Sequence, residues 1–236
     1  MHLEIKAVAF DLDGTLYPNY RFNLKIIPFI FKHSRLLYKF GKTRSIIRKQ
    51  QEDPSFIPKP DFYQYQAEIL ASLLNTQTDI IMEKTDRLIY KGWEPIFKKV
   101  KLYPYVEKTL NDMRKAGLKL GLLSDFPPKT KLIYLGLPGR EAPGDAGIWD
   151  AVMCSEHSGT IKPHPKSFLE LASELGQPPE KILYVGNSLN YDITGASRAG
   201  MKTAWIKHPL AIKKSKSPAP DFTFSDYRQL YDFVLN

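Results

Sequence analysis

The sequence predicts an α/β protein: a parallel-sheet core that carries an inserted, all-helical cap domain. Short apolar segments of strand character alternate with helical segments through the second half of the chain, which is typical of a parallel sheet with right-handed crossovers. The apolar segment Ile5–Phe10 is predicted to be a further strand. Between it and the next predicted strand the sequence has helical periodicity and no strand-like alternation. We therefore assign residues 1–16 and 101–236 to the core and residues 17–100 to the cap.

Residues that commonly end strands or helices bound each predicted element. Proline early in a segment and glycine just past its end mark the helices, and polar loops follow the strands. The later core strands are predicted at Leu118–Leu123, Ala151–Cys154, Lys181–Val185, Lys202–Ile206 and Phe222–Phe224. Core helices are predicted at Pro104–Met113, at Lys129–Leu135 and from Pro165 to Gly176. Cap helices are predicted near Leu24–Phe40, Thr43–Gln51, Tyr63–Leu74 and Thr78–Lys91.

Length and composition limit the class of protein. A chain of 236 residues suits one large domain or a core with an insertion. Cys154 is the only cysteine, so no disulfide can form within the chain, which fits a reducing compartment. There is no signal-peptide pattern at the start and no apolar run long enough to span a bilayer. We expect a cytoplasmic protein, either a monomer or a homodimer.

The positive charge is concentrated at the start of the predicted cap. Between Gly14 and Gln51 there is no Asp or Glu, and the nine Lys and Arg residues there equal the formal net charge of +9. They are Arg21, Lys25, Lys32, Arg35, Lys39, Lys42, Arg44, Arg48 and Lys49. Three interpretations stay open: a solvated helix face, attraction of anionic substrates, or contact with a membrane surface or an acidic partner. No nucleic-acid-binding motif accompanies the charge, so we expect no specific nucleic acid.

Two carboxylates follow the first predicted strand directly. Asp11 and Asp13 stand one residue apart in a tight loop, at the edge of the sheet where open α/β folds bind their ligands. Like charges this close repel each other unless a cation joins them or one holds a proton. Hard oxygen ligands favour Mg²⁺ as that cation. The alternative is an Asp-Gly turn that merely ends a strand.

The loops after the other strands carry groups suited to phosphate chemistry. Asp11 is placed to act as a nucleophile, and Asp13 to donate a proton to a leaving alkoxide and later activate water. Ser124 offers a hydroxyl and turn N–H groups to phosphoryl oxygens, and Lys162 a balancing positive charge. Asp192 adds a metal-binding oxygen. Because phosphoryl transfer depends mainly on positioning and charge neutralisation, so small a set suffices.

These loops, in this order, resemble the haloacid dehalogenase-like hydrolase superfamily of the type with a helical cap inserted after the first motif. The matching segments are Asp11–Leu16, Leu123–Ser124, Gly159–Pro165 and Gly186–Ala196. Together they span nearly the whole chain, which makes the match far more specific than any single loop. The resemblance implies a Rossmann-like core and a cap that closes over the site and selects the substrate.

The resemblance also implies roles for individual residues. Asp11 is the expected nucleophile, Asp13 the acid and base, and Lys162 the third catalytic residue. Ser124 and Lys162 are expected to hold the phosphoryl group. Mg²⁺ is the implied cofactor, with Asp11, Asp13 through its backbone carbonyl, Asn187 and Asp192 as the expected metal-binding residues.

Two positions depart from the family pattern. Asn187 stands where the family usually has a metal-binding aspartate; its amide oxygen can bind Mg²⁺ but brings no charge, so we expect lower affinity. Asp125, directly after Ser124, stands where asparagine is usual, and its carboxylate is not assigned to the phosphate.

The sequence therefore predicts a Mg²⁺-dependent hydrolase that removes phosphate from a small phosphorylated metabolite through an aspartyl-phosphate intermediate. A phosphomutase is the alternative within the enzyme class. The alternative from another class is a catalytically weakened binding protein whose basic cap docks on an acidic partner or a membrane surface. Asn187 keeps this second alternative open.

Overall fold

The computed structural model describes residues 4–92, 94–139, 147–208 and 217–236. In these ranges six strands form one sheet in the order β3-β2-β1-β4-β5-β6, and every neighbouring pair is parallel. The strands are β1 (Ala7–Phe10), β2 (Lys119–Ser124), β3 (Ala151–Cys154), β4 (Ile182–Gly186), β5 (Lys202–Ile206) and β6 (Phe222–Phe224). The sheet confirms the predicted α/β class; β3, β5 and β6 have the predicted bounds, and the ends of the other strands differ by at most two residues.

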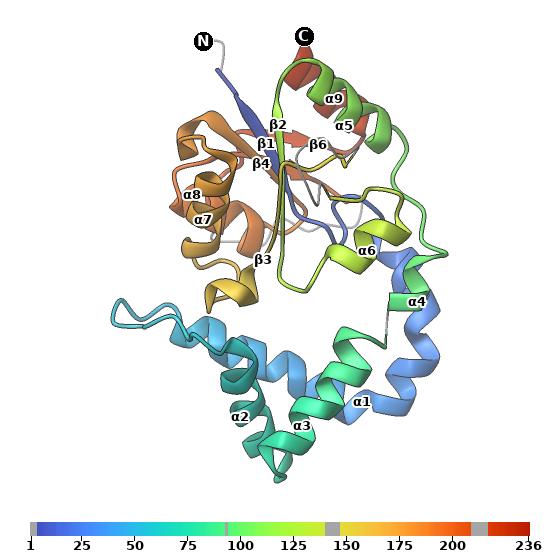
Figure 1. Ribbon diagram of the computed structural model, residues 1–236, viewed down its shortest axis with the longest axis vertical. Coiled ribbons are helices and arrows are strands. Elements are labelled where there is room, and N and C mark those ends of the chain that lie inside the picture. Colours follow the sequence, from blue (N-terminus) through green and yellow to red (C-terminus); the bar gives the residue numbers. More distant parts are fainter. Residues whose placement is uncertain (1–3, 93, 140–146, 209–216) are drawn as a thin grey trace.

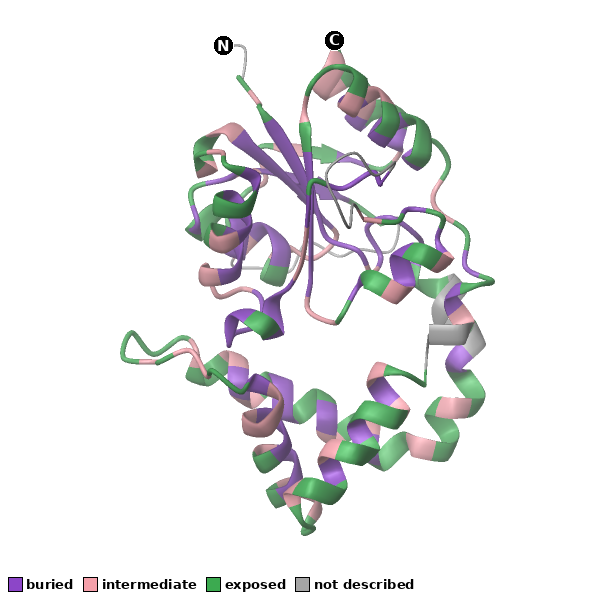
Figure 2. Cartoon of the chain, in the orientation of Figure 1, coloured by how far each residue is buried: buried purple, intermediate pink, exposed green. Residues whose placement is uncertain are grey.

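Alternation of side chains along β1 gives the molecule its layers. Val8 and Phe10 pack in one core cluster with side chains of α5 (Val106–Lys115) and α9 (Tyr227–Leu235). Ala7 and Ala9 face the opposite layer, formed by α7 (Lys166–Leu175) and α8 (Thr194–Arg198). Because successive side chains of a strand point to opposite faces, one short apolar run serves both layers. Figure 2 shows the central strands buried between these helices.

The register of the sheet brings three strand ends together. Phe10 lies opposite Leu122 of β2 on one side and Val185 of β4 on the other. The backbone N–H of Asp11 continues the pairing and donates to the carbonyl of Val185 at 2.9 Å. The loops after β1, β2 and β4 therefore start side by side at one edge of the sheet.

The helices that follow β1, up to but not including α5, form a separate layer beyond that edge, on the side away from both termini (Figure 1). We call this segment the helical insertion. It contains α1 (Asn19–Gln50), α2 (Phe62–Leu74), α3 (Thr78–Thr85), the π-helix η1 (Asp86–Tyr90) and α4 (Glu94–Phe97). Phe40, Leu70 and Ile81 belong to a small apolar core of its own. The insertion falls within the predicted cap, whose boundaries at 17 and 100 stay a prediction.

One expectation about the helices in the insertion was wrong. The break expected between Phe40 and Thr43 does not occur, because α1 runs through Gly41 and departs from helical geometry at His33 instead. Buried Phe40 and Ile47 hold the helix in place on both sides of Gly41, and this packing outweighs the weak helix propensity of one glycine. The helical segment expected over Thr78–Lys91 is present, as α3 to Thr85 and then as the π-helix η1 to Tyr90.

The remaining elements connect these layers. They are α6 (Lys129–Tyr134), the 3₁₀ helices η2 (Ser155–Ser158) and η3 (Pro179–Lys181), and the π-helix η4 (Leu189–Ile193). Within the described ranges, no helix combines the length and the apolar character that a membrane span requires.

Candidate active site

Asp11 lies at the centre of the candidate site and is almost fully buried. Its Oδ1 accepts a hydrogen bond from Lys162 Nζ at 2.6 Å, and its Oδ2 accepts one from Thr15 Oγ1 at 2.8 Å. Thr15 belongs to the loop after β1, and Lys162 comes from the segment before α7. Both carboxylate oxygens thus have fixed partners from different parts of the chain.

Lys162 joins two carboxylates. Its Nζ lies 2.6 Å from Asp11 Oδ1 and 2.6 Å from Asp192 Oδ1, and the ammonium is buried. Burial disfavours the charged lysine, but the carboxylates of Asp11 and Asp192 overcome this and raise the pKa of Lys162 well above its ordinary value. The lysine therefore stays positively charged at the edge of the sheet.

Asp192 is held by the loop after β4. Its Oδ2 accepts a hydrogen bond from the backbone N–H of Ser188 at 2.9 Å, so both of its oxygens are engaged. The carboxyl group packs so closely on Gly186 that a side chain at that position would collide with it. The π-helix η4 carries Asp192 into this place; π-helical turns are frequent at functional sites.

The surroundings of Asp11 change its acidity. Burial and the neighbouring carboxylate of Asp192 raise the pKa of Asp11 to about 7, while Lys162 acts in the opposite direction. Asp13 adds a smaller repulsion. Two lysines thus contact the carboxylates of this edge, Lys162 those of Asp11 and Asp192 and Lys131 that of Asp13.

Asp13 has partners that the sequence analysis did not assign. Lys131 Nζ, from α6, lies 2.9 Å from Asp13 Oδ2, and the hydroxyl of Tyr17 donates to Asp13 Oδ1. Tyr17 was visible as part of the loop after β1, but its contact was not expected. Lys131 sits in a short helix whose sequence has no feature that points to the site.

Gly14 and Ser124 determine the conformation of the loops that follow β1 and β2. Gly14 has φ +88°, and a side chain there would meet the amide of Asn187, so glycine lets the β1 loop and the β4 loop approach each other. Ser124 ends β2 and is buried, and its Oγ accepts a hydrogen bond from the backbone N–H of Phe126 at 3.1 Å. That bond forms a tight turn beside the lysine and carboxylate cluster.

The oxygen groups here fit Mg²⁺ in chemical type. No group of three His, Cys, Asp or Glu side chains in the described residues converges to hold a metal ion. Mg²⁺ commonly uses only one or two protein carboxylates and takes its other ligands from water and phosphate. Asn187 and Gly14 line a hollow of about 280 Å³, but Asp11, Asp13 and Asp192 are not among its lining residues. The oxygen groups of Asp11, Asp13, Asn187 and Asp192 thus fit Mg²⁺ in type, and their joint binding of one ion stays a prediction.

The basic residues expected to form one continuous face divide into two groups. Arg44 is buried and pairs with Glu156 and Asp125, and Arg48 lies 2.9 Å from Asp125 Oδ2. For these two arginines the interpretation as a solvated or substrate-attracting face is wrong, because core carboxylates neutralise them. Lys32, Arg35 and Lys42 of the same helix are exposed.

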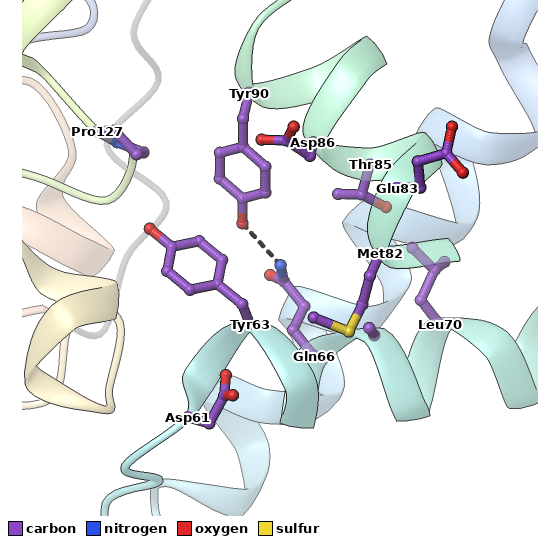
Figure 3. Close-up of a pocket in the computed structure, with 11 residues that line it drawn as sticks. Asp61, Tyr63, Gln66, Leu70, Met82, Glu83, Thr85, Asp86, Tyr90 and Pro127 are labelled. Carbon is purple, nitrogen blue, oxygen red and sulfur yellow. Dashed lines mark hydrogen bonds between the residues drawn. The ribbon is translucent and has the colours of Figure 1, made fainter. Parts of the chain in front are cut away.

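A pocket of about 480 Å³ lies between the helical insertion and the loop after β2 (Figure 3). Tyr63 and Tyr90 line it from the insertion, and Pro127 lines it from the core. Its lining contains Asp61, Glu83 and Asp86 but no Lys or Arg. Phe126 separates it from the carboxylates, with its ring 5.4 Å from Lys131 Nζ and 6.0 Å from the ring centre of Tyr90.

The fold and this cluster define a class: a doubly wound α/β protein with carboxylates and a lysine at the carboxyl edge of its sheet, and helices inserted after the first strand. Comparison with family models is more specific, because residues 5–200 match the model of haloacid dehalogenase-like hydrolases. The chain belongs to this family, which confirms the resemblance found in the sequence.

Curated relatives align over nearly their whole length. The chain is 29% identical to the glyceraldehyde 3-phosphate phosphatase of Methanopyrus kandleri, over 98% of this chain and 97% of the relative. It is 25% identical to the pyrophosphatase PpaX of Oceanobacillus iheyensis, over 98% of each. It is 28% identical to the phosphoglycolate phosphatase of Salmonella paratyphi A, over 96% of this chain and 91% of the relative.

Solved structures share the fold. A HAD phosphatase from Thermococcus onnurineus superposes with a TM-score of 0.62 at 23% identity, over 98% of each chain. The L-2-haloacid dehalogenase from Xanthobacter autotrophicus superposes with a TM-score of 0.65 at 20% identity, also over 98% of each chain. At these identities the likeness establishes the fold alone.

Proposed function

We propose that this chain is a phosphatase that hydrolyses a small phosphomonoester through an aspartyl-phosphate on Asp11. The observation that carries the proposal is the Lys162 ammonium held between Asp11 and Asp192, with Thr15 on the other oxygen of Asp11. This arrangement orients a carboxylate and places a permanent positive charge beside it. The curated relatives named above, all phosphatases or pyrophosphatases, support the same class of reaction.

In the first step a carboxylate oxygen of Asp11 attacks the phosphorus atom, and the bond from phosphorus to the alcohol oxygen breaks. Asp13 gives its proton to the departing alkoxide, so the alcohol leaves neutral. In the second step Asp13 takes a proton from water, which attacks the aspartyl-phosphate and releases inorganic phosphate. Lys131 and Tyr17 hold the Asp13 side chain for both transfers.

Lys162 and Ser124 have binding roles in this proposal. The Lys162 ammonium balances the negative charge that Asp11 and the phosphoryl oxygens bring together. The hydroxyl of Ser124 and the turn that it closes offer hydrogen bonds to the phosphoryl group. Asp192 takes part by fixing the lysine rather than by touching the substrate.

Mg²⁺ is the cofactor that we propose. Asp11, the backbone carbonyl of Asp13 and the amide oxygen of Asn187 would hold it, with Asp192 nearby. When bound, the ion would neutralise charge on the phosphoryl oxygens. Because Asn187 is uncharged, we expect half-saturation in the millimolar range.

The pocket beside Tyr63 and Tyr90 does not choose the leaving group in this proposal. None of the proposed catalytic residues lines it, and Phe126 separates it from the carboxylates. Two of its acidic side chains are also paired, Asp86 with Lys91 at 2.6 Å and Glu83 with Arg87 at 4.0 Å.

The function is tested by turnover of p-nitrophenyl phosphate with Mg²⁺, followed by a substrate panel. The panel compares glyceraldehyde 3-phosphate, phosphoglycolate and pyrophosphate. We expect kcat/KM to be highest for glyceraldehyde 3-phosphate, because the chain is 29% identical to a phosphatase of that compound over nearly the whole length of both. If no phosphate ester is hydrolysed at any Mg²⁺ concentration, the chain is the binding protein of the alternative hypothesis. The cytoplasmic location and the monomeric or homodimeric state stay predictions.

A further inference from the structure

Asp125 divides its two carboxylate oxygens between the two parts of the molecule. Its Oδ1 accepts hydrogen bonds from Ser155 Oγ at 2.6 Å and from the backbone N–H of Lys162 at 3.0 Å. Its Oδ2 lies 2.9 Å from Arg48 Nη2 and 3.2 Å from Arg44 Nη2, both of α1. One oxygen thus faces the sheet domain and the other faces the helical insertion.

Further hydrogen bonds join α1 to the sheet domain beside Asp125. We call this set of contacts between α1 and the sheet domain the junction. Arg48 Nε donates to the carbonyl of Lys162 at 2.8 Å. Gln51 donates to the carbonyl of Ile161 at 2.8 Å and accepts from its N–H at 3.1 Å. The second half of α1 is therefore fixed to the segment that presents Lys162.

The junction is largely buried, so its charges depend on each other. Arg44 is 5% exposed, and it also donates to Glu156 and lies over the ring of Phe126 at 4.5 Å. Burial tends to raise the pKa of Asp125, but Arg44, Lys162 and Arg48 lower it to about 2. Removing one partner from such a set leaves an uncompensated charge in a place that is largely shielded from water.

We propose that Asp125 is a positioning residue that joins docking of the helical insertion to assembly of the phosphate site. The proposal rests on the phosphatase function proposed above. With α1 docked, Arg44 and Arg48 fix one oxygen of Asp125, and the other oxygen then holds the backbone of Lys162. Since Asp125 also follows Ser124 directly, both proposed phosphate-binding residues are tied to the docked state. When α1 moves away, the carboxylate keeps only its core partners and Lys162 loses the bond from Arg48.

The chemistry of the side chain explains why aspartate suits this position. An asparagine could keep its oxygen toward Ser155 and Lys162, but its NH₂ group would then face the two guanidinium groups. A donor would meet donors, and no charge would balance the arginines. Asp125→Asn thus removes the favourable contact with Arg44 and Arg48 but keeps the contacts with Ser155 and Lys162, in a side chain of the same size.

The test measures three junction variants: Asp125→Asn, Arg48→Gln and the double variant that combines them. Lys49→Gln is the control. Lys49 is exposed and adjacent to Arg48, so its variant removes the same charge from the same helix outside the junction. We expect each junction variant to lower kcat for p-nitrophenyl phosphate about tenfold while KM changes less than about threefold, because the phosphate site acts mainly in the transition state. Lys49→Gln should stay within about twofold of the wild type.

The double variant and hydrogen exchange distinguish positioning from a loss of folding. If Asp125 and Arg48 act as one unit, the double variant is no slower than the slower single variant. The amide of Lys162 should exchange faster in Asp125→Asn and Arg48→Gln but not in Lys49→Gln. Arg48→Lys should restore activity only in part, since lysine cannot bond Asp125 and the Lys162 carbonyl with one planar fork.

Two results would overturn the proposal. One is wild-type kcat in Asp125→Asn or, should that variant not fold, in Arg48→Gln. The other is strictly multiplicative effects in the double variant together with unchanged exchange at Lys162. In both cases the wild-type protein still turns over phosphate esters, so the proposed function would stand. A wild type without turnover would instead remove the function itself.

Discussion

Asn187 is the residue whose substitution tests the proposed metal site most simply. Its amide packs on Gly14, and it lines the same hollow beside the β1 loop. Asn187→Asp adds a charged oxygen of the same shape. We expect it to lower the Mg²⁺ concentration for half-maximal activity by about tenfold, because ligand charge sets the affinity of such sites.

Asn190→Asp is the matched control for this substitution. Asn190 lies in the same loop, is exposed and does not line that hollow. Its variant carries the same added charge outside the proposed metal site and should leave half-saturation unchanged. An unchanged or raised half-saturation in Asn187→Asp would mean that this side chain does not face the ion.

At the residue scale, the sequence could predict the groups that strand order brings together. Asp11, Lys162 and Asp192 follow from the rule that parallel strands end at one edge, and the structure joins all three. Lys131 and the role of Asp125 could not be predicted. The role of each residue depends on a contact with a side chain from a distant part of the sequence. Neither periodicity nor a motif indicates such a contact.

Gly41 offers a test of the continuous helix α1. It lies in α1 with ordinary helical geometry, and a Cβ there would meet nothing within 4 Å. Gly41→Ala should raise the free energy of unfolding by about 0.5–1 kcal/mol, because alanine loses less backbone entropy on folding. Urea denaturation measures the change.

Gly117→Ala is the opposite case. Gly117 has φ +84°, a backbone conformation that costs alanine about 1 kcal/mol, although its surroundings are also open. This variant should be less stable than the wild type. Equal effects of the two substitutions would show that α1 is interrupted at Gly41, as the sequence alone suggested.

The basic face of α1 is testable only through its exposed members. Lys32, Arg35 and Lys42 are exposed, unlike Arg44 and Arg48, which pair with core carboxylates. If these exposed cations attract substrate, kcat/KM should fall with salt in the wild type, and replacing all three with glutamine should flatten that dependence. Salt-reversible binding to anionic vesicles would support the membrane alternative. Flat salt profiles without vesicle binding would leave a solvated face.

At the element scale, local patterns predicted most strands and helices because apolar spacing and glycine or proline boundaries are local. The exceptions are elements that distant contacts decide. The π-helices η1 and η4 have no local signature, and α1 continues through Gly41 because Phe40 and Ile47 pack against other segments.

The junction of the two parts should contribute to a pH-dependent stability of the whole molecule. Burial raises the pKa of Glu156 to about 7, against the pull of Arg44, from an ordinary value of 4.5. A carboxyl group with a raised pKa binds its proton more tightly in the folded state. The contribution of Glu156 to the free energy of unfolding is therefore present below about pH 4.5 and is lost as the pH rises toward 7.

Glu156→Gln should remove this part of the pH dependence. We expect the free energy of unfolding to fall less between pH 5 and pH 7.5 in the variant than in the wild type, as measured by urea denaturation. Glu52→Gln, at an exposed position of the insertion, is the control and should follow the wild type. Equal slopes in all three proteins would show that Glu156 is ionised alike in the folded and unfolded states.

The covalent intermediate on Asp11 is the central claim about the whole molecule. It is tested most directly by acid-quenching the enzyme during turnover of a ³²P-labelled phosphomonoester and mapping the label by mass spectrometry. The account predicts one base-labile phosphate, located on Asp11, and no label in folded Asp11→Asn, which should also have lost turnover. Wild-type turnover without a labelled aspartate, or label and turnover that persist in Asp11→Asn, would contradict it.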